Sequence, residues 1–274
     1  MPNINLVNPQ LGNIQATIKR FGDGQISAHV DMNMQDWNDP VFIKTRLSSY
    51  QDMLDLMAIV QSIRGQGYKE LILVAPFILG GRGDLQFSDK ENLSIRLTAN
   101  LINSCGFSKV YTVDAHSPVM YVAIDNCQEQ FTTPYEYFLI NKNIKNSCQV
   151  LIAPDAGGYK RLVNFAKAIG KPLYSAVKYH DFNTDKPIVH FNEDVSGMDC
   201  VIVDDICDGG RTFIHLAKLL REKGAKTVTL CVTHGMFFYG TKLEGIDMIY
   251  TTNSYREFKE EEMHENFKVI DIFI

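Results

Sequence analysis

The chain has 274 residues, of which 45% are hydrophobic and 22% charged, and its formal net charge is -5 at pH 7. This length favours two domains, at about 100–200 residues per domain. The composition is typical of a soluble globular protein. The acidic balance and the lack of any basic run argue against nucleic acid or an anionic membrane as a partner.

Cysteine usage and the N-terminal sequence predict a cytoplasmic protein. The six cysteines are scattered without Cys-x-x-Cys spacing, so we expect buried free thiols rather than disulfides or a zinc site. The segment Met1–Asn5 lacks a charged leader with an apolar core, and the longest apolar runs have the length of a strand. We therefore expect neither secretion nor a membrane span.

The elements predicted for the first half begin with a hairpin at a sheet edge, in which two alternating segments flank a glycine-rich turn. Apolar runs and helical periodicity then predict alternating strands and helices. The hairpin is expected at Ile14–Arg20 and Gln25–Val30, strands at Pro40–Lys44, Leu71–Ala75 and Lys109–Val113, and helices at Gln51–Arg64 and Ser88–Cys105.

The second half repeats this alternation, which predicts an α/β fold with parallel sheets covered on both faces. The polar stretch Asn141–Ser147 is the expected boundary, giving domains 1–140 and 141–274. Strands are expected at Cys148–Ala153, Pro172–Lys178, Cys200–Asp204, Thr227–Val232, Met248–Thr251 and Lys268–Phe273, and helices at Tyr159–Ile169 and Phe213–Lys223.

The most informative stretch is an apolar strand that ends in Asp204 and Asp205 and leads through Asp208-Gly209-Gly210-Arg211-Thr212 into a helix. Glycines allow a tight turn close to a ligand, and the N–H groups at a helix start favour an anion. Neighbouring strand residues point in opposite directions, so we expect one aspartate to reach hydroxyls or a metal and the other to support the loop. The pattern fits a sugar phosphate.

Further segments resemble, in the same order along the chain, the signature motifs of the ribose-phosphate pyrophosphokinases. The phosphate-loop motif is also similar to that of type I phosphoribosyltransferases, so the other segments carry the distinction. Arg20–Gln25 resembles R-F-x-D-G-E, Val74–Asp84 resembles V-x-P-Y followed by A-R-Q-D, Val113–His116 resembles D-x-H, Ala153–Arg161 resembles S-P-D-x-G-G-x-x-R, and Val232–Gly235 resembles A-T-H.

This resemblance implies two similar phosphoribosyltransferase-like α/β domains, each a mainly parallel sheet flanked by helices, in a homo-oligomer of two or more subunits. It implies ATP in the first domain, a ribose phosphate in the second, and Mg²⁺ as the cofactor. ATP would be bound by Phe21, Asp23, Gln25, Arg82, Asp84 and His116, the metal by His116 and Asp155, and the ribose phosphate by Asp204, Asp205 and Asp208–Thr212, with Lys178, Arg82 and His116 as the catalytic group.

The implied reaction passes pyrophosphate from ATP to the C1 hydroxyl of a 5-phosphorylated ribose, giving phosphoribosyl pyrophosphate and AMP. Departures from the motifs leave alternatives open. Gln25 replaces an acid, and Gly83 replaces a glutamine. The two arginines expected directly after Lys178 are absent, and Tyr179-His180 stands in their place. Arg211 adds a guanidinium suited to phosphate, so ADP-ribose is an alternative acceptor, giving ADP-ribose pyrophosphate for NAD resynthesis. An inactive regulatory homologue and a phosphoribosyltransferase are further alternatives.

Several of these residues also have purely structural interpretations. His116 can be a hydrogen-bonded residue at a strand end, and Asp155 can cap a helix in an ordinary turn. The aromatic stretch Met236–Tyr239 is expected to serve packing rather than a site.

Overall fold

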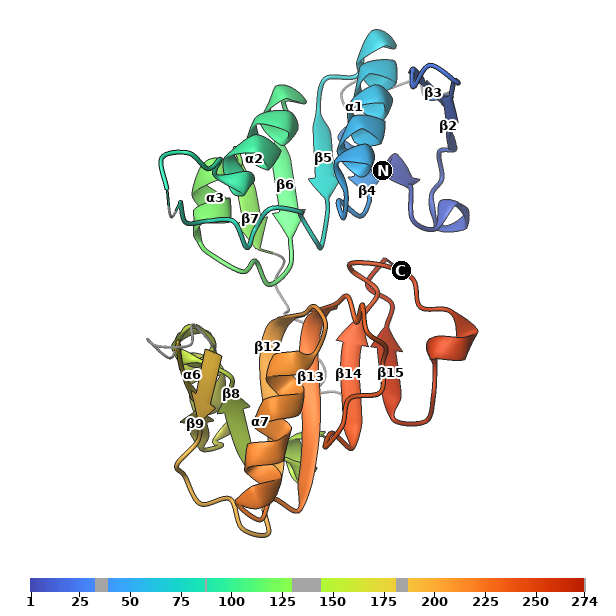
Figure 1. Ribbon diagram of the computed structural model, residues 1–274. Helices are drawn as coiled ribbons and strands as arrows, with labels where there is room; N and C mark the ends of the chain where they lie inside the picture. The colour runs from blue at the N-terminus through green and yellow to red at the C-terminus, as the bar shows by residue number, and fades with distance from the viewer. Residues whose placement is uncertain (33–38, 87, 130–143, 181–186, 274) are drawn as a thin grey trace. The chain divides into compact units, whose positions relative to one another are not determined.

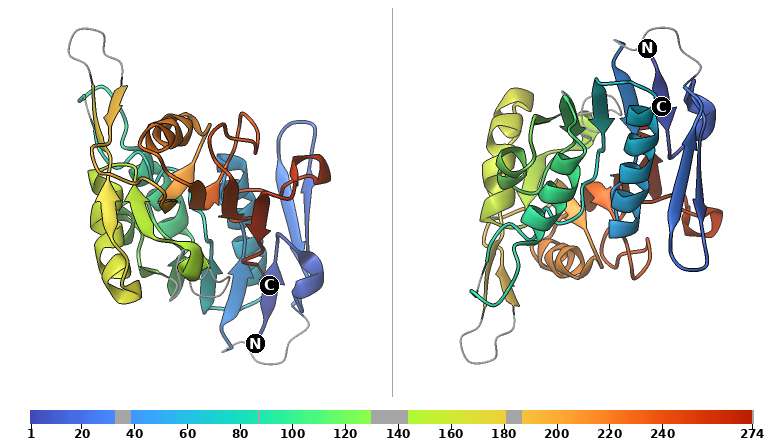
Figure 2. Two further views of the ribbon diagram at one scale, coloured as in Figure 1. Left: turned by 90° about the horizontal axis from the view of Figure 1, so that it is seen from below. Right: turned by 90° about the horizontal axis from the view of Figure 1, so that it is seen from above.

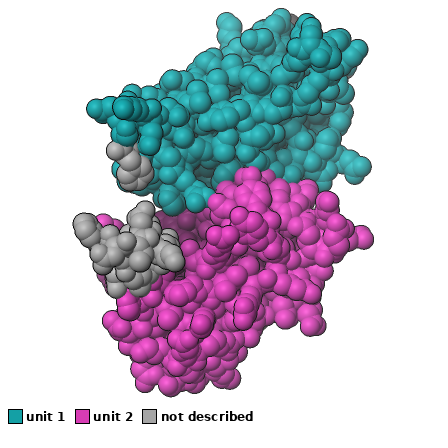
Figure 3. Space-filling model, in the orientation of Figure 1, with its two compact units in different colours: residues 1–131, 271–274 teal, residues 132–270 magenta. Residues whose placement is uncertain are grey.

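The computed structural model describes residues 1–32, 39–86, 88–129, 144–180 and 187–273. Its contacts divide the chain into two units, residues 1–131 with 271–274, and residues 132–270 (Figure 3). The domain boundary expected at 140/141 lies outside the described residues. The division differs from the expected one at the C-terminus. There Asn5 Nδ2 donates to the Phe273 carbonyl at 3.1 Å, and Arg46 lies over the Phe273 ring.

Unit 1 contains a parallel sheet with the strand order β1-β4-β5-β6-β7 (Figure 1). Ser49 and Asp52 form a capping box at the start of α1. It provides acceptors for backbone N–H groups that have no partner within the helix. The elements are β1 (Asn3–Asn5), β2 (Ala16–Arg20), β3 (Ile26–Val30), β4 (Val41–Lys44), α1 (Tyr50–Gly65), β5 (Leu71–Val74), α2 (Ser94–Ser104), β6 (Lys109–Thr112), α3 (Val119–Ala123) and β7 (Cys127–Glu129), with a 3₁₀ turn at Pro9–Leu11.

Two predictions for unit 1 need correction. The hairpin β2–β3 is not an edge of the main sheet but a separate two-stranded ribbon beside α1 (Figure 2). Arg20 pairs with Asp55 of α1, which links the ribbon to the helix. The helix expected from Ser88 begins at Ser94, because Gln86 Nε2 donates to the carbonyls of Ser88 and Glu91 and holds the preceding residues in a loop.

Unit 2 contains a six-stranded parallel sheet with the strand order β15-β14-β13-β12-β8-β9. The expected strands and helices of this half are present, with several boundaries shifted. The elements are α5 (Ile144–Ser147), β8 (Val150–Ala153), α6 (Ala156–Ile169), β9 (Leu173–Ser175), β10 (Val177–His180), β11 (Pro187–His190), β12 (Asp199–Cys207), α7 (Arg211–Glu222), β13 (Thr227–Gly235), β14 (Met248–Thr252) and β15 (Phe267–Ile270), with a 3₁₀ turn at Glu260–Glu262.

The core of unit 2 shows why both faces of its sheet are apolar. Ile202 of β12 packs in one cluster with Leu216 of α7, whereas its neighbour Val203 packs in another cluster with Phe165 of α6. Successive strand residues point to opposite faces, so α6 and α7 cover opposite sides of the sheet. This arrangement leaves the carboxyl ends of the strands open for a site.

The strand expected at Pro172–Lys178 is divided in two at Ala176. The Ala176 N–H donates to the Ala153 carbonyl at 2.9 Å, which completes the pairing of β9 with β8. The chain then forms the antiparallel ribbon β10–β11, in which Lys178 lies opposite Val189. Among the residues that the structure describes, no helix is both long and apolar enough to span a bilayer.

Candidate functional site

The centre of the candidate site in unit 2 is a pair of carboxylates held by one guanidinium. Arg161 Nη2 lies 2.6 Å from Asp204 Oδ1 and 3.0 Å from Asp205 Oδ1. The expectation that the two aspartates diverge is therefore wrong in this respect, because both reach the same nitrogen. Arg161 was not predicted as a site residue. The signal was available, since Arg161 ends the motif that begins at Ala153.

This arrangement strongly affects the ionisation of Asp204. Burial and the adjacent Asp205 carboxylate raise the pKa of Asp204 well above its usual range, although the Arg161 guanidinium opposes the shift. The Asp205 N–H also donates to Asp204 Oδ1 at 3.0 Å, which favours the ionised form. Asp204 is thus a carboxylate that gains from an added positive charge or from hydroxyl donors.

The glycine loop after β12 has the shape expected of an anion cradle. Gly210 has φ +80° and precedes the first residue of α7, Arg211. A Cβ at Gly209 would lie 2.4 Å from the Tyr239 ring, and one at Gly210 would lie 2.6 Å from Leu243 Cδ2. The positive φ makes glycine necessary at Gly210, whereas a side chain at Gly209 would have to displace the Tyr239 ring. The loop backbone lies at the N-terminus of a twelve-residue helix.

The segment after β13 lies against this loop. The Phe238 N–H donates to the Asp208 carbonyl at 3.1 Å, and the Arg211 guanidinium lies 5.4 Å from the centre of the Tyr239 ring. Met236 and Phe237 are buried as expected, but Phe238 is 58% and Tyr239 74% exposed. The expectation of packing is confirmed for Met236 and Phe237, whereas the exposed Phe238 and Tyr239 make ring contacts at the surface, with Tyr255 and Arg211.

Asp155 is the N-cap of α6, and its Oδ1 accepts a hydrogen bond from the Gly158 N–H at 2.9 Å. This is the structural interpretation considered for it, and it also fixes the carboxylate at the carboxyl end of β8. Strand β8 pairs in parallel with β12, so their carboxyl ends lie side by side. This end of the sheet therefore carries Asp155, the paired aspartates and the glycine loop. Arg161, on the helix that Asp155 caps, bonds to Asp204 and so links α6 to β12.

In unit 1, Arg82 and His116 are both exposed and follow the neighbouring strands β5 and β6. A Cβ at Gly81 would lie 4.0 Å from the Cβ of His116, so the loop that carries Arg82 and Asp84 lies beside the D-x-H segment. The N-terminus of α2 supports this loop, because the Ile95 N–H donates to the Gly83 carbonyl at 3.3 Å. The structure thus brings these predicted residues together.

The remaining predicted residues lie elsewhere. Phe21, Asp23 and Gln25 form the exposed turn of the β2–β3 hairpin, where the Gln25 N–H donates to Asp23 Oδ1 and Lys19 lies over the Phe21 ring. Lys178 belongs to the β10–β11 ribbon, and its side chain is outside the described part of the structure.

The described residues include no group of three or more His, Cys, Asp or Glu side chains arranged as a metal site. Mg²⁺ does not require such a cluster, since it keeps several waters and binds one or two carboxylates together with substrate phosphates. Asp155, on the open edge of unit 2, and the exposed His116 of unit 1 fit that mode of binding.

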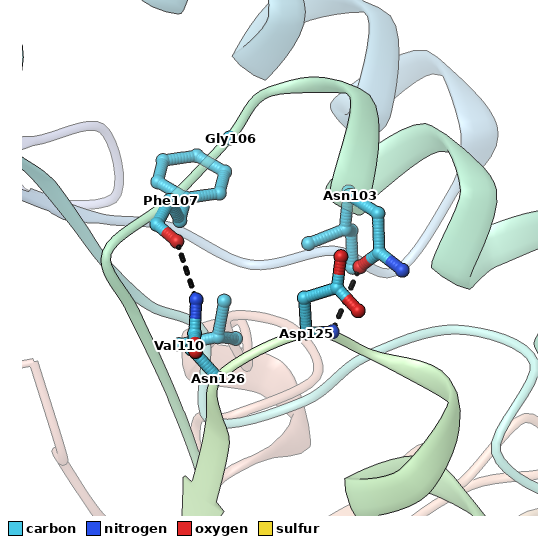
Figure 4. A pocket seen from close by; sticks show the side chains of 7 residues that line it. Asn103, Gly106, Phe107, Val110, Asp125 and Asn126 are labelled. Carbon is cyan, nitrogen blue, oxygen red and sulfur yellow. Dashed lines mark hydrogen bonds between the residues drawn. The ribbon is translucent and has the colours of Figure 1, made fainter.

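A cavity of about 260 Å³ lies at the opposite end of β6, between α2 and the start of β7 (Figure 4). The side-chain amides that line this cavity already make hydrogen bonds within the fold. Asn103 Oδ1 accepts from the Asp125 N–H at 2.9 Å, and Asn126 Nδ2 donates to the Phe107 carbonyl at 3.1 Å. The cavity is therefore separate from the predicted site residues, which follow the carboxyl ends of the strands.

Comparison with known proteins shows a phosphoribosyl transferase domain in this chain. The model of the phosphoribosyl transferase domain matches residues 135–267. The structure of a phosphoribosylpyrophosphate synthetase from Mycobacterium smegmatis superposes with a TM-score of 0.79 at 23% identity, covering 94% of this chain and 86% of that one, and so shares the fold.

Curated ribose-phosphate pyrophosphokinases match most of the sequence. The protein from Aquifex aeolicus is 31% identical over 81% of this chain and 72% of its own length. The one from Agrobacterium fabrum is 30% identical over 85% of this chain and 75% of its own length. The chain therefore belongs to the ribose-phosphate pyrophosphokinases, a family of transferases, as its motifs predicted.

We predict that Asp204→Asn stabilises the protein and impairs its activity. Because the folded-state pKa is raised, the charged carboxylate lowers stability as the pH rises from about 4, the usual Asp value, through the folded value. At neutral pH the variant should therefore unfold at a higher temperature than the wild type, and the difference should shrink as the pH falls towards 4. Thermal unfolding across this range tests the prediction, and a lower midpoint at neutral pH would contradict it.

We predict that Gly210→Ala lowers both stability and activity. The substitution places a Cβ at positive φ against Leu243, at a cost of about 1–3 kcal/mol. Gly197→Ala is the matched control, since Gly197 has φ +70° and nothing within 4 Å of an added Cβ. Denaturation and AMP-release assays should show stability loss in both variants and activity loss in Gly210→Ala alone. Equal activity losses would argue against a role for the loop.

Proposed function

We propose that the protein transfers pyrophosphate from ATP to the C1 hydroxyl of ribose 5-phosphate, giving phosphoribosyl pyrophosphate and AMP. The observation that carries the proposal is the edge of unit 2 where Arg161 holds Asp204 and Asp205 beside the Gly209–Gly210 turn. Carboxylates suit the 2- and 3-hydroxyls of a ribose, and N–H groups at a helix start suit its 5-phosphate. The names of the relatives support the same reaction.

In the proposed reaction the sugar is the nucleophile. The C1 hydroxyl oxygen attacks the β-phosphorus of ATP, the bond from this phosphorus to the α,β-bridging oxygen breaks, AMP leaves, and the hydroxyl proton passes to solvent. Positioning and charge stabilisation supply most of the catalysis for such a transfer. Bound Mg²⁺, held by His116 and Asp155, would offset phosphate charge. Arg82 and Lys178 would contact the transferred group.

The ATP site is proposed to include Phe21, Asp23 and Gln25 as contacts to the base, together with Asp84 and His116. The exposure of the hairpin turn supports a role in which it completes the ATP site of a neighbouring subunit. The protein would then act as a cytoplasmic homo-oligomer. A molar mass of one chain in solution, measured by light scattering in the presence of ATP and Mg²⁺, would contradict this part of the proposal.

We predict that incubation with ATP, Mg²⁺ and ribose 5-phosphate releases AMP and forms an equimolar amount of phosphoribosyl pyrophosphate. Arg161→Ala should lower kcat/KM by about 10–100-fold, because it leaves the two carboxylates without the guanidinium that positions them. Arg221→Ala is the control and should retain activity, because Arg221 lies in the last turn of α7, away from the glycine loop, and pairs with Asp247. Absence of AMP release with both ribose 5-phosphate and ADP-ribose would contradict the proposal and favour an inactive homologue.

A second candidate is the same chemistry with ADP-ribose as acceptor. The observation that favours it is the exposed Arg211 guanidinium over Tyr239, at the mouth of the glycine loop. A guanidinium can bind a second phosphate, and an exposed aromatic ring can contact the attached nucleoside. The product would be ADP-ribose pyrophosphate, a precursor for NAD resynthesis.

We predict that Arg211→Ala distinguishes the two acceptors. If Arg211 contacts a second phosphate, kcat/KM should fall about 10–100-fold more for ADP-ribose than for ribose 5-phosphate. Lys218→Ala removes an exposed charge from the same helix and should change neither value. Equal losses for both acceptors would contradict a contact to the second phosphate.

A further inference from the structure

The loop that carries His116 turns at a residue in an unusual conformation. Asp114 has φ +47° and is only 4% exposed. The other non-glycine residues with positive φ among those described are Asn126 and Phe237. An L-residue adopts this conformation rarely, and it persists where surrounding contacts determine it. The contacts that hold Asp114 therefore decide where the chain goes next, which is towards His116.

Glu129, at the end of β7, supplies one of those contacts. Its Oε1 accepts from the Asp114 N–H at 2.8 Å, and its Oε2 accepts from the Tyr121 hydroxyl at 2.5 Å. Asp114 precedes His116, and Tyr121 follows it on α3. A single carboxylate thus connects both ends of the loop that presents His116.

The position of Glu129 is itself fixed by the sheet. In the parallel pairing of β6 and β7, Glu129 lies opposite Thr112, two residues before Asp114. Burial and the hydrogen bond to Glu129 raise the pKa of Tyr121, so its hydroxyl remains a donor at physiological pH. The loop is therefore held by the edge strand β7 on one side and by a protonated phenol on the other.

We propose that Glu129 is a positioning residue, which holds Asp114 in the left-handed conformation and so presents His116 beside the Arg82 loop. Glu129 acts through the backbone of Asp114 and does not touch the substrate. The catalytic part of this inference rests on the proposed role of His116 in binding the ATP complex. The structural part, that Glu129 determines the conformation of Asp114, does not depend on that role.

The structural part is tested by a stability cycle. Glu129→Ala should lower the unfolding midpoint by a few °C. The decrease should be smaller in an Asp114→Gly background, because glycine adopts positive φ without steric cost. Gln128→Ala, at the exposed neighbouring position on β7, is the control and should show no such coupling. Equal decreases in both backgrounds would overturn the proposal.

The catalytic part is tested by a double-mutant cycle that combines Glu129→Ala with His116→Ala and compares their kinetic constants. Glu129→Ala should lower kcat about 10–100-fold, as for other partners that orient a metal-site residue, and leave the KM for the acceptor unchanged. Glu129→Gln should retain an intermediate rate, because its amide oxygen still accepts from the Asp114 N–H. The double variant with His116→Ala should be no slower than His116→Ala alone.

The outcomes separate this inference from the proposed function. Additive losses in the kinetic cycle would show that Glu129 acts independently of His116, for example as a direct ligand, and would overturn the positioning role. An unchanged rate for His116→Ala alone would refute the proposed role of His116 and with it the catalytic part. The stability cycle would still decide whether Glu129 holds Asp114.

Discussion

The contact between Arg161 and the two aspartates is the interaction on which the candidate site depends. Adjacent carboxylates at a strand end repel each other and lose hydration, which raises the pKa of Asp204. Arg161 offsets that cost and at the same time joins α6 to β12. A group that binds there would replace or share this charge, so hydroxyl donors or a cation suit the pair of carboxylates.

The two units place their predicted site residues by the same means. Each is a parallel sheet whose strands end, on the carboxyl side, in polar side chains, and in each a backbone turn with positive φ helps to place them. In unit 2, Gly210 takes a positive φ at the start of α7, and in unit 1, Asp114 takes one before His116. A transfer between phosphates needs precise placement more than it needs acids and bases, and rigid turns provide that placement.

One departure from the family motifs, Arg211, lies at the outer end of the phosphate loop. Arg211 and Tyr239 contact each other there, and Tyr239 also packs against Gly209. The carboxylates that face the proposed ribose hydroxyls are separate from this pair. In the proposed reaction, a group attached to the 5-position of the ribose would meet Arg211 and Tyr239, whereas the transfer itself would take place at C1.

The sequence by itself determined the alternation of strands and helices, the loop after Asp205 and the family, because these follow from local periodicity, glycine placement and motif order. It did not determine that Arg161 joins both aspartates, that Glu129 contacts Asp114, or that Phe238 and Tyr239 are exposed beside the loop. Each of these depends on strands or helices distant in sequence meeting at one edge of a sheet. Only the register and packing of the folded sheets bring those side chains together.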